Sequence, residues 1–99
     1  MKTYPVNDKS GKLHAFEVRN TLFTTRRVAA LLRKTPGVAN VKVVSRLFST
    51  PSDVRIRFVW RGHKLIVWEP WGDNSRYWIG PDDDSEEVEI DDLKRVFST

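Results

Sequence analysis

The chain of 99 residues is 39% hydrophobic and 30% charged, a composition typical of one globular domain, which excludes wholesale disorder. It contains no cysteine, which excludes disulfides and thiolate metal sites, and no apolar run of membrane-spanning length. The net charge of +4 is unevenly divided: residues 1–81 carry fifteen bases and five acids, whereas residues 82–99 carry two bases and eight acids. A basic body with an acidic tail favours a polyanion partner, or a tail that screens a basic face.

A hairpin is predicted at the beginning of the chain. Its strands run over residues 3–6 and 12–19, on either side of a turn-forming cluster at residues 7–11. Strand alternation places three side chains of the second strand on one face: His14, Phe16 and Val18.

The main helix is predicted over residues 23–34, with Thr24 as its N-cap and Phe23 packed on Val28 as a hydrophobic staple. Residues 35–37, Thr-Pro-Gly, end the helix. Four residues form its apolar stripe: Val28, Ala29, Leu31 and Leu32.

Residues 54–80 contain all four tryptophans, and they predict three consecutive antiparallel strands that follow a strand over residues 38–47. A two-residue type II′ turn at residues 62–63, Gly-His, sets the register of the first two of these strands. That register places Arg57 opposite Trp68.

The strand alternation gives this sheet two different faces. The core face consists of Val41, Val43, Val54, Ile56, Phe58, Trp60, Leu65 and Val67. The opposite face is basic and partly aromatic, and it consists of Lys42, Val44, Arg46, Arg55, Arg57, Val59, Arg61, Lys64, Ile66 and Trp68.

The last predicted strand covers residues 76–79 and follows a tight turn at residues 72–75. Its register places Glu69 opposite Trp78 on the core face. Pro70 has no backbone donor, which predicts a bulge or a strand end at that position.

Residues 81–87 predict a mobile acidic connector, and residues 92–97 predict a short helix that Asp91 caps. Three apolar residues at helical spacing dock this helix: Ile90, Leu93 and Phe97. The predicted fold class is α+β, with a mainly antiparallel sheet in the order β-β-α-β-β-β-β-α and helices packed on one face. The whole chain, residues 1–99, is expected to form a single domain in which residues 82–90 are the acidic connector.

The basic face is the first candidate site. Its charges suit phosphates and its aromatic rings suit stacked bases, so it predicts nucleic-acid binding. The alternatives are a protein-contact face, or a solvated face in which Arg57 covers Trp68 as a structural cation–π pair. The candidate residues are Lys42, Arg46, Arg55, Arg57, Arg61, Lys64, Trp68 and Tyr77.

The second candidate is the tryptophan-rich hairpin over residues 69–78, where aromatic and charged residues gather as they do at interface anchors. Its candidate residues are Glu69, Trp71, Asp73, Arg76 and Tyr77. The alternatives are a small-ligand site, a catalytic site, and a structural hairpin end with an ion pair between Glu69 and Arg76.

The third candidate is the acidic run over residues 82–86. It lacks the glycine and the distal glutamate of a calcium loop, so a solvated linker, a lid on the basic face and a partner-docking segment are its possible roles.

These patterns predict a small non-enzymatic binding module that contacts a protein partner or a second copy through the tryptophan hairpin and the basic face. Nucleic-acid binding by the arginine face is the first alternative, and a small enzyme that uses Glu69 or Asp73 is the second. No cofactor, metal or membrane partner is expected. Because the first residues lack the apolar core of a signal peptide, a cytoplasmic location is expected.

Overall fold

The computed structural model describes residues 2–19, 24–44, 54–69, 76–83 and 85–98. Its elements are β1 (Thr3–Asn7), β2 (Leu13–Arg19), α1 (Thr25–Lys34), β3 (Val38–Val43), β4 (Val54–Trp60), β5 (His63–Trp68), β6 (Arg76–Pro81) and α2 (Asp91–Ser98). The predicted α+β class and the predicted order of elements are confirmed.

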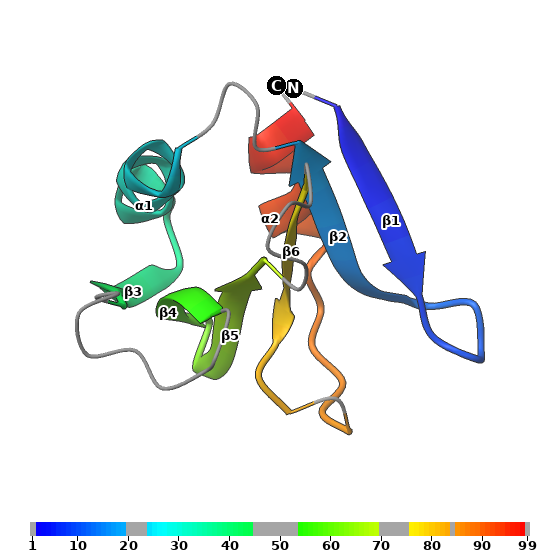
Figure 1. Cartoon of the computed structure of the whole chain (residues 1–99). Coiled ribbons are helices and arrows are strands. Elements are labelled where there is room, and N and C mark those ends of the chain that lie inside the picture. The colour runs from blue at the N-terminus through cyan, green and yellow to red at the C-terminus, as the bar shows by residue number, and fades with distance from the viewer. Residues whose placement is uncertain (1, 20–23, 45–53, 70–75, 84, 99) are drawn as a thin grey trace.

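All six strands form one antiparallel sheet in the order β1-β2-β6-β5-β4-β3 (Figure 1). Helix α1 packs on β3 and β4, and α2 packs on β1 and β2. Both helices contribute to the same hydrophobic core, so they cover one face of the sheet. We call the opposite face the open face. The core residues of the helices are Val28, Ala29, Leu32, Leu93 and Phe97.

The register between β4 and β5 differs from the predicted one by two residues. The two turn residues are Arg61 and Gly62, with φ of 47° and 85°, so the turn has the positive φ values of type I′ rather than type II′. Trp60 therefore lies opposite His63, and Arg57 lies opposite Ile66 instead of Trp68. Because a shift of two residues preserves the alternation, the core-face residues predicted on these two strands are all buried, as expected. Val43, which was predicted on the same face, lies opposite Ile56 but is not part of the core, because it is 43% exposed on the edge strand β3.

The register between β5 and β6 differs by one residue, which exchanges the faces of β6. Trp78 lies opposite Trp68 rather than Glu69. It therefore belongs to the open face, whereas Tyr77 is in the core and only 5% exposed. The prediction that Tyr77 is available for stacking is wrong, and its hydroxyl instead lies 3.3 Å from Thr25 Oγ1.

A bulge in β2 changes the position of His14. Val6 lies opposite Ala15 but Asn7 lies opposite Leu13, so His14 is the extra residue. Phe16 and Val18 are buried as predicted, whereas the ring of His14 leaves their face and contacts Trp78.

Both helices begin and end close to the predicted positions. Thr24 caps α1 by accepting a hydrogen bond from the backbone N–H of Arg27 at 3.3 Å, as predicted. The proposed staple residue lies outside the described residues. In α2, Asp91 is the first helical residue rather than the cap, and its N–H donates to the carboxylate of Glu89 at 2.7 Å.

The described part of the acidic segment, residues 82–83 and 85–90, packs against the sheet through both apolar and polar contacts. Val88 and Ile90 are buried in the core. The backbone carbonyl of Glu89 accepts a hydrogen bond of 2.8 Å from the indole of the buried Trp60. This segment is therefore anchored at these points, not solvated along its whole length.

Candidate functional site

The open face is built around two tryptophans from neighbouring strands. The rings of Trp68 and Trp78 meet edge to face, with centroids 5.8 Å apart and planes at 86°. Gly80 makes room for this arrangement, because a Cβ at that position would lie 2.8 Å from the Trp78 ring and 2.7 Å from the Cβ of Ala15. The absent side chain of Gly80 thus allows Trp78 to lie close to the sheet.

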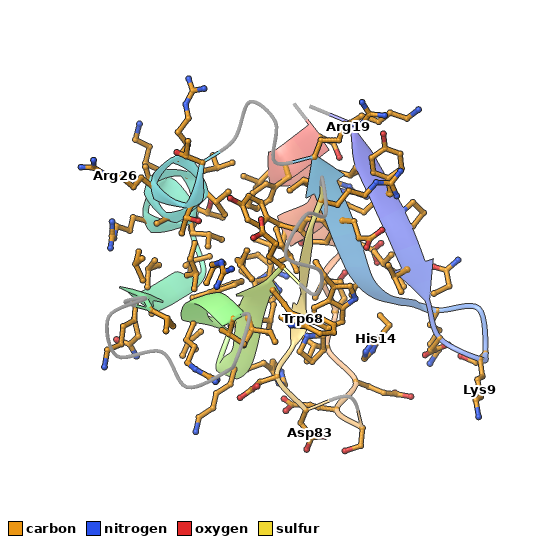
Figure 2. All side chains as sticks on the ribbon, in the orientation of Figure 1. Lys9, His14, Arg19, Arg26, Trp68 and Asp83 are labelled. Carbon is orange, nitrogen blue, oxygen red and sulfur yellow. The ribbon has the colours of Figure 1, made fainter. Side chains whose placement is uncertain are left out.

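The two tryptophans form walls of a shallow groove, which we call the aromatic groove. It has a volume of about 460 Å³. Its lining residues are His14, Ile66, Trp68, Trp78, Pro81 and Asp82. The centroids of the His14 and Trp78 rings are 6.1 Å apart, and Figure 2 shows His14 and Trp68 near each other between β5 and the hairpin of β1 and β2. The chemistry of the groove is apolar and aromatic, with one carboxylate at its rim.

Arg57 and Asp82 form one flank of the groove, where a guanidinium nitrogen lies 3.1 Å from a carboxylate oxygen. Both side chains are close to half exposed, at 50% and 42%. Because such an exposed pair contributes little to stability, its main effect is to balance the charge beside the groove.

Arg76, Glu17 and Tyr4 form the other flank. Arg76 donates to Glu17 at 3.2 Å, and its guanidinium lies 3.6 Å from the centroid of the Tyr4 ring. The hydroxyl of Tyr4 accepts a hydrogen bond from Arg19, which is the largest of the influences that lower the pKa of this phenol below 10.0. Each flank of the groove therefore carries a cation next to a carboxylate.

The structure brings together only part of the predicted site. Arg57, Lys64, Trp68 and Arg76 belong to the open face, and they lie within or next to the groove region. Three other predicted residues lie outside the described part of the chain: Arg46, Trp71 and Asp73.

Two predicted pairings are replaced by others. Arg57 lies beside Asp82 rather than over Trp68, because the register between β4 and β5 differs from the predicted one. Arg76 pairs with Glu17, and Glu69 accepts from Arg55 at 3.3 Å instead. The side chains of Arg55 and Glu69 are only 15% and 12% exposed, so this ion pair lies mostly below the surface.

Arg61 lies at the hairpin turn, away from the groove. Its guanidinium lies over the ring of Trp60, 4.3 Å from the centroid, and contacts the carboxylates of Glu89 and Asp92 at 3.4 and 2.9 Å. Nearby, His63 contacts Glu86. Much of the positive charge predicted for this part of the sheet is thus balanced by residues 82–92.

The described residues contain no cluster of metal-binding side chains. No group of three or more His, Cys, Asp or Glu side chains lies close enough there to hold a metal ion. A second hollow of about 870 Å³ lies between the turn of β1 and β2 and residues 85–91. Across the described helices, none is both long and apolar enough to cross a membrane.

Two features of the surface are not among the predicted site residues. His14 lies in the groove because of a bulge in β2, and no turn-forming residue in the sequence marks the position of that bulge. The outward side of α1 is strongly basic, and its signal was present, because no Asp or Glu occurs between Glu17 and Asp53. The exposed bases of this helix are Arg26, Arg27, Arg33 and Lys34.

Comparisons with known proteins give no family for this chain. No protein-family model matches it, and neither a curated protein nor a solved structure matches it.

Proposed function

We propose that this chain is a non-enzymatic binding module whose aromatic groove docks a protein surface, and that the occupant is a second copy of the chain. The observation that supports this proposal is the asymmetry of the sheet. Two helices cover one face, whereas the open face carries the pair Trp68 and Trp78 beside an open groove. Exposed parts of tryptophan, tyrosine and arginine are the usual anchors of protein interfaces.

The charges beside the groove favour a protein over a polyanion. Arg57 is next to Asp82 on one flank, and Arg76 is next to Glu17 on the other. A nucleic acid would bring its phosphates close to these carboxylates. A protein surface with charges of both signs can instead match each flank.

The same two flanks favour a second copy as the protein that binds. In a two-fold interface the same patch faces itself, so one flank of each copy can meet the other flank of its partner. Arg57 of one copy can then face Glu17 of the other, and Asp82 can face Arg76. The two open faces would form the layers of a sheet-on-sheet packing with the tryptophans at its centre.

Sedimentation of the purified chain over a range of concentrations tests this proposal. The wild-type chain is expected to pass from monomer to dimer. Trp68→Ala is expected to weaken the dimer by about 30-fold, since truncation of an interface hot spot costs about 2 kcal/mol or more. Val43→Ala is the control, because Val43 is 43% exposed and lies on β3, outside the groove lining.

A charge exchange tests the matching of the flanks without removing a tryptophan. The double variant Arg57→Asp/Asp82→Arg keeps an ion pair within each copy but places like charges across the interface. It is expected to weaken the dimer while the thermal unfolding midpoint stays close to that of the wild type. A wild-type chain that stays monomeric, or a dimer that Trp68→Ala and the exchange leave intact, would contradict the proposal.

A further inference from the structure

We infer that the outward side of α1 binds the phosphate backbone of duplex DNA. This inference does not depend on the proposed function, because it concerns another surface of the molecule. Acidic residues of the 82–92 segment meet Arg57 and Arg61. Within the part of the chain that the structure describes, no carboxylate forms an ion pair with Arg26, Arg33 or Lys34.

The bases of α1 lie on the exposed side of the helix. Arg26, Ala30 and Arg33 follow one another at helical spacing on the exposed side, opposite the buried Val28 and Leu32. The rise of an α-helix separates Arg26 from Arg33 by about 10 Å along the axis. Figure 2 shows Arg26 projecting from α1 away from the sheet. Ala30, between the two arginines, leaves room for the close approach of a ligand.

The composition of the exposed side of α1 indicates which class of polyanion it fits. A membrane-binding helix carries large apolar residues next to its bases, whereas the exposed positions of α1 carry only bases and Ala30. Single-stranded nucleic acid is bound by stacking on aromatic rings, and α1 contains no aromatic residue. Duplex RNA has a deep, narrow major groove, whereas the major groove of B-form DNA, about 12 Å wide, admits an α-helix. Duplex DNA is therefore the ligand that this surface fits best.

The test is binding of the full-length chain to a short mixed-sequence DNA duplex over a salt series. With three phosphate contacts, from Arg26, Arg33 and Lys34, the logarithm of the association constant is expected to fall with the logarithm of salt concentration with a slope of about −3. The double variant Arg33→Gln/Lys34→Gln is expected to reduce the magnitude of this slope by about 2 and to weaken binding roughly 30- to 100-fold near 0.1 M salt.

The matched control is Lys9→Gln/Lys12→Gln, which removes the same net charge from the turn between β1 and β2. Figure 2 places Lys9 at the opposite side of the molecule from Arg26. This control is expected to weaken binding by less than about 3-fold, as is Arg33→Lys/Lys34→Arg, which keeps both charges on α1. Thermal unfolding verifies that all variants fold.

Three outcomes would overturn the inference. The first is an equal loss of affinity in the control and the helix variant, which would indicate a response to net charge alone. The second is the absence of salt-dependent binding to the duplex by the wild-type chain. The third is tighter binding to single-stranded DNA or to vesicles of anionic lipid than to the duplex.

Discussion

At the scale of single residues, the geometry of the aromatic groove depends on Gly80. An alanine Cβ at this position would lie 2.7 Å from the Cβ of Ala15 and 2.8 Å from the ring of Trp78. The Cβ of Ala15 is fixed to the backbone of β2 and cannot rotate away, so the backbones of β2 and β6 must move apart, and the ring of Trp78 must move as well. The shape of the groove is therefore expected to depend on a residue that carries no side chain.

Gly80→Ala is expected to lower the free energy of unfolding by roughly 1–3 kcal/mol, the usual cost of overpacking. This cost exceeds the 0.5–1 kcal/mol, approximately, by which alanine is preferred to glycine through the entropy of the unfolded chain. Urea denaturation measures the change, with Val43→Ala as a surface control within about 0.5 kcal/mol of the wild type. A wild-type stability for Gly80→Ala would show that Trp78 does not need this space.

Arg61 explains why one register was predicted incorrectly. Positive φ at a non-glycine residue is uncommon, so the turn was expected to begin with Gly62. Arg61 nevertheless adopts a φ of 47°. Its side chain lies over Trp60 and contacts Glu89 and Asp92, and these contacts join residues distant in sequence, which no local pattern can reveal.

The carboxylate of Asp8 is expected to make the stability of the protein depend on pH. Its carboxylate accepts hydrogen bonds from the hydroxyl and the N–H of Ser10, and the hydroxyl contact is the largest of the influences that lower its pKa below 3.8. A lowered folded-state pKa stabilises the protein above the unfolded-state value, and this stabilisation disappears as the pH falls through the folded-state value. Asp8→Ala is therefore expected to lower the thermal unfolding midpoint at neutral pH, by an amount that shrinks progressively below about pH 4.

A pH titration of the unfolding midpoint of both chains checks this expectation. Lys9→Ala in the same turn is the control, because its effect should not disappear over the acidic range. A difference between wild type and Asp8→Ala that stays constant down to strongly acidic pH would contradict the assigned role.

At the scale of the elements, a register error of an even number of residues keeps each side chain on its predicted face of the sheet, whereas an odd error moves it to the other face. A two-residue error between β4 and β5 left the predicted core face intact, whereas a one-residue error between β5 and β6 exchanged Tyr77 and Trp78. The hydrophobic pattern of β4 and β5 identifies their buried side from the sequence. In β6 both of these neighbours are aromatic, so the pattern does not distinguish the buried side from the open side.

The hydrogen bond between Trp60 and Glu89 is expected to hold the acidic segment against the sheet. The indole N–H donates to the carbonyl of Glu89 at 2.8 Å, while the ring is 1% exposed. Trp60→Phe removes this donor and leaves the carbonyl without it, which costs about 1–3 kcal/mol. Amide hydrogen exchange is expected to increase in residues 85–90 more than in β1.

Trp68→Phe is the comparison for this variant, because no hydrogen bond of the Trp68 indole is found among the described residues. It is expected to destabilise the chain less than Trp60→Phe does. Equal losses of stability, or unchanged exchange in the acidic segment, would show that the hydrogen bond to Glu89 does not hold the segment.

Charge separation is the main feature of the whole molecule. The division between a basic body and an acidic tail was visible in the sequence, as was the order of the elements. The sequence could not reveal which bases the acids meet, because Arg57 and Asp82 are 25 residues apart and Arg61 and Asp92 are 31 apart. The structure shows these pairs on the sheet, and α1 is left with exposed bases.

The candidate site was predictable in its composition but not in its geometry. Trp68 and Arg76 were identified from the density of aromatic and charged residues. Trp78 meets Trp68 because of the register between β5 and β6, and His14 reaches Trp78 because of the bulge in β2. Glu17 pairs with Arg76 because β2 lies beside β6 in the sheet.

The indole N–H signals of the tryptophans during dilution of the chain provide the most direct test of the aromatic groove as an interface. The signals are assigned with single Trp→Phe variants. The proposed dimer predicts that the signals of Trp68 and Trp78 shift with concentration, whereas that of Trp60, which is 1% exposed, stays fixed. Signals of Trp68 and Trp78 that do not change over the whole range, or that change only together with Trp60, would contradict docking of a second copy on the open face.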